Sequence, residues 1–338
     1  MLEIKQLKKN FGKFTAINNL DLHIEKGEIF GFVGHNGAGK TTTMKIVAGL
    51  LSATSGEVYI DRIGNVILYK KGRTGHQKVM ISAHMDEVGF QVIKEISDKR
   101  YRIKALGSIK TWDAYQQRVV SGNAFGVIKA FEEDNLKAHN YENLYLEIIG
   151  GEKPEVGDVF AFEGNFAETE KYYLGKALDN RLACGLLIDL IKKDIPTESD
   201  VVYVFSVQEE IGMRGVRVAK TSINPDLHIC IDTTAEGDRN SVELAKGVAI
   251  KISDGMTVAT TKTVNWLKMI AIDNKIRYQM EANDCGINEL IISNELDYGN
   301  SEAGISIPCR SMHSANVAVY KQDYFDCELL MEKVILAI

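Results

Sequence analysis

Short apolar runs that end in a polar turn recur along this chain. VMISAHMDE leads into His84 and Asp86, VVYVFSVQEE into Glu209 and Glu210, and LHICIDTT into Asp232. Such runs, alternating with helical patterns, predict a sheet covered on both faces, where polar side chains converge only at the strand ends. Because ligands of open α/β sheets bind at that edge, we expect a functional site there.

Two further segments have the same character. Asp179 lies in GKALDNRLACGLLIDLIKK, where the apolar spacing predicts a helix that begins near Asn180 and packs on the sheet. His313 follows ISIPCRSMHS, another passage from a strand into a loop. The pattern also predicts a last helix over residues 324–338.

The pattern changes between residues 89 and 172. Short strands are separated there by Gly, Asp and Asn turns, as in VGFQVIKEI, RYRIKAL, NAFGVIKAF, NLYLEII and DVFAFEG. This arrangement is typical of a small β-barrel or sandwich inserted into an α/β domain.

The polar residues at the strand ends have the composition of a two-metal hydrolase site. Two imidazoles and three carboxylates suit a pair of divalent ions about 3.5 to 4 Å apart, bridged by one carboxylate. Asp86 is placed to support the His84 imidazole, and Glu209 to accept a proton from water. Taken singly, each residue has a simpler explanation: a structural histidine, a solvated turn or a helix cap. Their common location favours the metal site.

The first sixty residues contain a different motif. GHNGAGKT follows the strand-like EIFGFV and precedes the helix-like TTTMKIVAGLL, which is the context of a phosphate-binding loop. Its glycines let backbone N–H groups surround phosphate, while its lysine and threonine suit ATP phosphates and magnesium. The candidate nucleotide-binding residues are Gly34, Asn36, Gly37, Gly39, Lys40, Thr41 and Thr42.

Composition narrows the classes of function. With 338 residues, 45% of them apolar, the chain can form two or three packed domains. A formal net charge of −6 without a basic run argues against nucleic acid or an anionic membrane as partner. No apolar stretch reaches the about 18 residues of a membrane span. An odd number of cysteines, five, without paired spacing favours reduced thiols and a cytoplasmic location.

From about residue 61 to the C-terminus the sequence resembles the tetrahedral aminopeptidases, also called glutamyl or deblocking aminopeptidases and, in older usage, cellulase M. The resemblance rests on the segments DRIGNVILYKKG, SAHMDEVGF, GKALDNR, VQEEIGMRG, ICIDTT and ISIPCRSMHS, which occur in the family's order. It implies a mixed sheet sandwiched by helices, formed by residues 61–88 and 173–338. Residues 89–172 would be an inserted β-barrel that makes subunit contacts.

The same resemblance implies the roles of the site residues. One zinc or cobalt ion would be bound by His84, Asp179 and Asp232, and a second by Asp179, Glu210 and His313. Asp179 would bridge the ions, Glu209 would be the general base, and Asp86 would support His84. The implied activity is removal of N-terminal residues from oligopeptides, in a dodecameric cage.

Residues 1–60 resemble the beginning of an ATP-binding-cassette subunit, but no LSGGQ-like signature follows. We therefore interpret this part as a truncated fragment joined to the peptidase near Asp61. Three alternatives remain open: a transporter ATP-binding subunit, a glycosidase, or a fused chain with an inactive peptidase site. The missing signature disfavours the first, and histidine ligands have no place in the carboxylate-pair mechanism of the second.

Overall fold

The computed structural model describes residues 2–11, 14–24, 57–137, 139–237, 240–284, 286, 288–290, 292 and 301–338. The chain divides into two compact units, Met1–Ser55 and Gly56–Ile338. In the first unit, strands β1 (Leu2–Phe11) and β2 (Phe14–Ile24) pair antiparallel. The phosphate-binding loop predicted at residues 34–42 lies outside the described residues.

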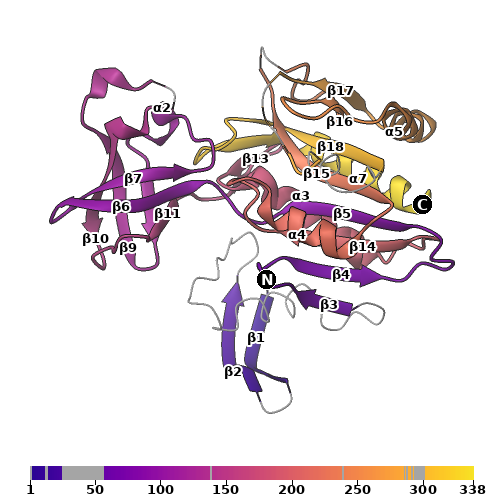
Figure 1. Ribbon diagram of the computed structural model, residues 1–338, viewed down its shortest axis with the longest axis horizontal. Helices are drawn as coiled ribbons and strands as arrows, with labels where there is room; N and C mark the ends of the chain where they lie inside the picture. Colours follow the sequence, from indigo (N-terminus) through magenta and orange to yellow (C-terminus); the bar gives the residue numbers. More distant parts are fainter. Residues whose placement is uncertain are drawn as a thin grey trace. The chain divides into compact units, whose positions relative to one another are not determined.

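The second unit is built around a mixed sheet (Figure 1). Its order along the main path is β12-β13-β19-β18-β15-β5-β14-β4-β3, with β16 paired to β18 and β17 paired to β16. Neighbours among β18, β15, β5 and β14 run parallel, whereas β4 and β19 pair antiparallel at either side. The strands are β3 (Glu57–Ile60), β4 (Val66–Lys70), β5 (Lys78–His84), β12 (Ala167–Glu168), β13 (Tyr172–Gly175), β14 (Asp200–Ser206), β15 (Leu227–Ala235), β16 (Val248–Ser253), β17 (Tyr278–Ala282), β18 (Ser301–Arg310) and β19 (Val317–Tyr320).

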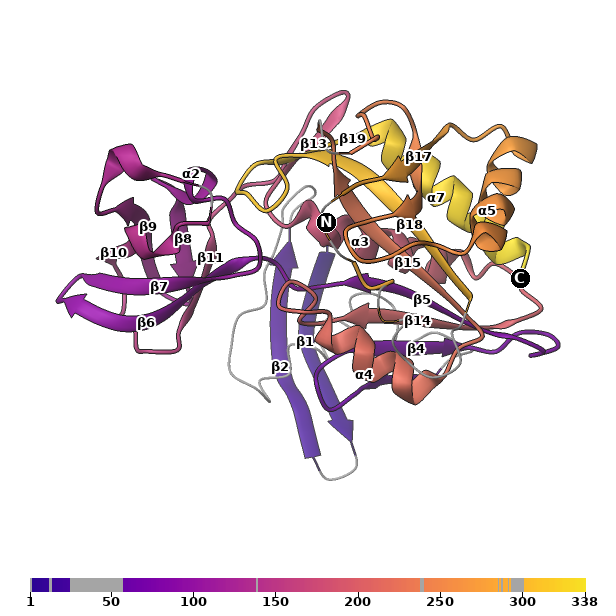
Figure 2. The same ribbon diagram turned by 45° about the horizontal axis from the view of Figure 1, so that its top comes forward.

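Helices cover both faces of this sheet, as the apolar runs predict. Helix α4 (Arg214–Ile223) lies on one face, whereas α3 (Leu178–Lys193) and α7 (Lys321–Leu336) lie on the other (Figure 2). Helix α5 (Thr261–Asp273) contacts α7 and the β16–β18 side of the sheet. Every residue of β14 is buried, which explains the unbroken apolar run VVYVF in its middle.

The segment between residues 89 and 162 forms a closed barrel in the order β10-β7-β6-β11-β8-β9. Its elements are β6 (Gly89–Ser97), β7 (Arg100–Leu106), α2 (Thr111–Ala114), β8 (Arg118–Ser121), β9 (Ala124–Ala130), two short 3₁₀ helices (Glu133–Asn135 and Tyr141–Asn143), β10 (Leu144–Gly150) and β11 (Val159–Phe162). The barrel has its own core, in which Phe90 and Phe162 pack edge to face. A closed barrel leaves no free strand edge.

Two paired strands lie on either side of the predicted junction of the two sequence patterns. Residues 57–60, which we assigned to the cassette fragment, form β3 and pair antiparallel with β4 in the peptidase sheet. Just after it, the Asp61 carboxylate accepts hydrogen bonds from the backbone N–H groups of Ile63, Gly64 and Asn65. The sheet therefore continues across residue 61 without a break.

Candidate metal centre

The predicted ligands arise from elements whose ends meet at one edge of the parallel strands. His84 is the last residue of β5, and Asp232 lies within β15, which pairs with β5. Asp179 stands at the start of α3 in a non-helical conformation. The next side chain, Asn180, donates to the Ile231 carbonyl at 2.8 Å and so anchors this turn beside β15.

Glu209 and Glu210 lie in a tight loop between β14 and α4. Backbone bonds fold this loop back on itself, because the N–H groups of Gly212 and Met213 both donate to the Glu209 carbonyl. Gly215 closes it: a Cβ there would lie 2.2 Å from the Val207 carbonyl oxygen, so no other residue fits. The compact loop therefore requires the glycine that ends the segment VQEEIGMRG.

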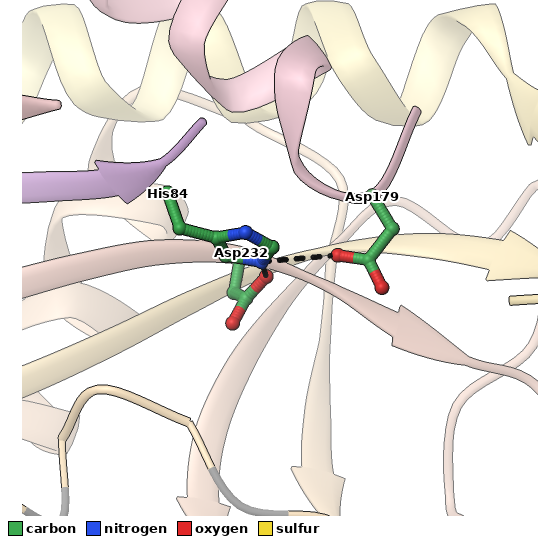
Figure 3. Close-up of side chains that lie close together, drawn as sticks. All are labelled: His84, Asp179 and Asp232. Atoms are coloured by element: carbon green, nitrogen blue, oxygen red, sulfur yellow. Dashed lines mark ion pairs between the residues drawn. The ribbon is translucent and has the colours of Figure 1, made fainter. Parts of the chain in front are cut away.

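The two imidazoles approach opposite oxygens of one carboxylate. His84 Nε2 lies 3.3 Å from Asp179 Oδ1, and His313 Nε2 lies 3.1 Å from Asp179 Oδ2. Asp232 Oδ1 is 3.5 Å from His84 Nε2, and Glu210 Oε2 is 3.3 Å from His313 Nε2. Figure 3 shows His84, Asp179 and Asp232 converging from a strand end, a helix start and a neighbouring strand. Asp179 is therefore shared by two groups of donors.

Each group consists of three donors close enough to bind a single ion. His84, Asp179 and Asp232 form one, and Asp179, Glu210 and His313 form the other; in each group the donor atoms lie within 4.8 Å of one another. The Glu210 Oε1 atom is buried without a hydrogen-bond partner. Because a buried carboxylate oxygen needs a hydrogen bond or a cation, this arrangement fits divalent ions.

The electrostatics of the cluster reflect its crowding. Burial alone would raise the pKa of Asp179, but hydrogen bonds from His313 and His84 outweigh it and hold that pKa below its usual range. Burial raises the pKa of Glu210 to about 8, with the charge of Asp179 adding to the effect. Burial and the nearby Asp232 and Glu210 charges raise the pKa of Glu209 well above its ordinary value.

Asp86 contacts both His84 and the Glu209–Glu210 loop. The hydrogen-bond contact with His84 Nδ1 is made by the Asp86 backbone carbonyl at 3.3 Å, whereas its carboxylate lies 3.6 Å from that nitrogen. The carboxylate also accepts hydrogen bonds from the backbone N–H groups of Glu209 at 3.1 Å and Glu210 at 3.2 Å. Asp86 thus links the end of β5 to the Glu209–Glu210 loop.

A cavity of about 820 Å³ opens at the cluster and continues along the end of β15. Several charged residues of its wall, among them Lys110, Glu236 and Lys251, were not predicted from the sequence. Lys251 on β16 is almost fully buried and contacts Glu281 at 2.6 Å, while Ser306 donates to the same carboxylate at 2.5 Å. A lysine within the apolar run GVAIKI is the signal that could have identified it.

Residues 64–330 match the family model for M42 glutamyl aminopeptidase. The chain belongs to this family. A putative aminopeptidase of Acetivibrio thermocellus is 33% identical over 300 residues, covering 84% of this chain and 89% of that protein. The family model and this relative favour a peptidase over a transporter subunit.

Solved structures of other peptidases share the fold. Aminopeptidase APDkam598 from Desulfurococcus kamchatkensis superposes with a TM-score of 0.80 at 28% identity, covering 88% of this chain and 90% of that chain. The TET1 peptidase of Pyrococcus horikoshii, which can assemble into a tetrahedron or a large octahedral shell, has a TM-score of 0.77 at 22% identity; the coverage is 92% and 97%.

The N-terminal part has a separate relative. The lantibiotic transport ATP-binding protein SrtF of Streptococcus pyogenes is 49% identical over 61 residues, which are 18% of this chain and 27% of that protein. The similarity is therefore to a short piece of an ATP-binding-cassette protein.

Two other expectations concern the chain as a whole. Four cysteines, Cys184, Cys230, Cys309 and Cys327, are buried and free, and Cys285 lies outside the described residues. Among the helices of the described ranges, none is both long and apolar enough to cross a membrane.

Proposed function

We propose that this M42 family member is a dinuclear metallo-aminopeptidase that removes N-terminal residues from oligopeptides. The observation that carries the proposal is the position of Asp179, whose two carboxylate oxygens face two different imidazoles at 3.3 and 3.1 Å. A carboxylate in that position is suited to bridge two ions.

The donor set supports zinc or cobalt as the ions. His84, Asp179 and Asp232 would hold one ion, and Asp179, Glu210 and His313 the other. Mixed imidazole and carboxylate donors suit borderline divalent metals better than magnesium or calcium, which prefer oxygen alone. Bound there, the ions supply Lewis acidity, which polarises a carbonyl oxygen and makes water more acidic.

Glu209 is the residue to which we assign proton transfer. Its Oε2 lies 3.9 Å from His84 Nε2, and it belongs to neither three-donor group. It lines the cavity beside both groups, so a water molecule placed between them is within reach. Glu209 accepts a proton from the attacking water and donates it to the departing amine nitrogen.

Hydrolysis of aminoacyl p-nitroanilides, with and without added zinc or cobalt, tests this proposal. Metal-dependent release by the unmodified chain is expected, and Glu209→Gln should lose turnover by several orders of magnitude while it retains both ions. No hydrolysis of any substrate, by protein shown to hold two ions, would refute the proposal.

We further propose that the chain forms a homo-oligomer through its barrel, residues 89–162, and that the mixed sheet with its helices is the catalytic domain. This sheet includes β3 and β12, which the sequence-based bounds of 61–88 and 173–338 leave outside the catalytic domain. The assembling TET1 peptidase of similar fold supports this. A dodecamer is the expected species in native mass spectrometry. A monomer at micromolar concentration would contradict it.

A further inference from the structure

The two histidines of the metal centre are oriented by different parts of the chain. Each presents Nε2 to the cluster and Nδ1 to a backbone carbonyl. For His84 that carbonyl belongs to Asp86, at 3.3 Å. For His313 it belongs to Ser108, at 2.8 Å. Ser108 is separated from His313 by 205 positions and lies in the link between β7 and α2 of the barrel.

The backbone of this link is held firmly. The Ile109 side chain is fully buried in the barrel core, and its carbonyl accepts a hydrogen bond from the Tyr141 hydroxyl at 2.6 Å. Gly107 precedes Ser108 with a φ of +89°. A Cβ at Gly107 would lie 2.6 Å from Val88 Cγ1 and 3.0 Å from Glu210 Oε2.

These contacts place the link against one half of the site only. Ser108 contacts His313, and Gly107 packs against Glu210; both of these side chains belong to the same three-donor group. An imidazole that donates from Nδ1 to a carbonyl keeps its lone pair on Nε2, which is the tautomer that binds a metal. The carbonyl of Ser108 therefore selects the tautomer and the ring orientation together.

We propose that the barrel is an integral part of the metal centre: the Ser108 carbonyl is a positioning group for His313, and Gly107 is the residue that allows it to approach. The inference rests on the proposed function, because it concerns the second of the two ions. The barrel then has a task in the site of its own subunit, in addition to any role in assembly.

Titration of the metal-free Gly107→Ala variant with zinc tests this proposal, with binding measured by calorimetry or by competition with a chelator. The variant should bind one equivalent as tightly as the unmodified protein, and the other about 10- to 100-fold more weakly, the usual effect of losing a ligand's supporting contact. Gly157→Ala is the matched control, since Gly157 is also a barrel glycine, with a φ of +104° and no neighbouring atom within 4 Å of the place where a Cβ would lie. It should bind both ions normally.

A second variant approaches the same hydrogen bond from its other end. Replacement of His313 by Nδ1-methylhistidine removes the donor and retains Nε2, so it should also weaken one ion selectively, even if Gly107→Ala does not fold. Ser108→Ala keeps the carbonyl and should bind both ions normally. Unchanged binding of both ions by the methylhistidine protein would overturn the inference, as would equal weakening of both. Fewer than two ions in the unmodified protein would overturn the proposed function itself.

Discussion

One buried amide connects the start of β4 to the loop that carries Glu209, and its removal should damage both stability and catalysis. Asn65 is fully buried. Its Nδ2 donates to Asp61 Oδ2 at 2.6 Å and to the Gly215 carbonyl at 2.8 Å, and its Oδ1 accepts the Val207 N–H at 3.0 Å. Asn65→Ala removes all three bonds.

The loss of stability in Asn65→Ala can be worked out from these three hydrogen bonds. A neutral hydrogen bond contributes about 1 kcal/mol, and one to a carboxylate about 1.5 kcal/mol or more. Because Asp61 is partly exposed, we expect a loss of about 3 kcal/mol. At about 2 to 4 °C per kcal/mol for a unit of this size, the Tm should fall by about 6 to 12 °C. Without its hydrogen bond to Asn65, the backbone at Val207 can shift, and Glu209 shifts with it. This displacement should lower kcat/KM by about 10- to 100-fold.

Asn143→Ala provides the matched control. Asn143 is a buried amide with three hydrogen bonds of its own, to the Glu132 backbone N–H and carbonyl and to the Asn135 carbonyl, all within the barrel. Thermal unfolding should show a loss of stability in both variants, whereas steady-state kinetics below the transition should show lower kcat/KM only for Asn65→Ala. If Asn65→Ala loses stability but keeps full kcat/KM, the loop is held by other contacts and the reasoning fails.

Three further predictions concern the site and its surroundings. Asp179→Asn should release both ions, as measured by elemental analysis. The control Asp189→Asn, at a half-exposed position of the same helix, should retain both. Full metal occupancy in Asp179→Asn would exclude a bridging role for Asp179. Chelation should lower the Tm, because ions that bind only the folded state stabilise it, and added zinc should restore it; an unchanged Tm would contradict tight binding. Burial lowers the pKa of His228 from 6.5 to about 3, so below pH 6.5 the unfolded state binds more protons than the folded state. The free energy of unfolding should therefore fall as the pH drops below 6.5, by about 2 kcal/mol at pH 5. His228→Gln should remove that part of the pH dependence in urea unfolding of chelated protein, and an identical dependence would show that His228 does not titrate in this way.

The strands that carry the site could be predicted from the sequence because buried parallel strands have distinctive apolar runs. The runs before His84, Glu209 and Asp232 correspond to β5, β14 and β15. The barrel strand β8, Arg118–Ser121, was not predicted, because its sequence RVVS contains only two apolar residues. Helix α7 begins at Lys321 and not near residue 324, because the polar Lys321 and Gln322 hide its first turn.

The site itself was predictable in its residue types and only partly in its contacts. Polar side chains near strand ends can be identified from the apolar runs that precede them. The donors so identified do come together in the structure: His84, Asp179, Asp232, Glu210 and His313. Backbone contacts leave no such signal. The Ser108 carbonyl and the hydrogen bonds that Asp86 accepts from two backbone N–H groups depend on how the barrel link and the loop fold.

The most direct test of the two-metal account is turnover of a free N-terminal aminoacyl substrate as metal-free protein is titrated with zinc or cobalt. Activity is predicted to rise until two equivalents are bound per chain and to remain constant after that point, with both equivalents also counted by elemental analysis. A plateau at one equivalent, or turnover that is independent of added metal, would contradict it.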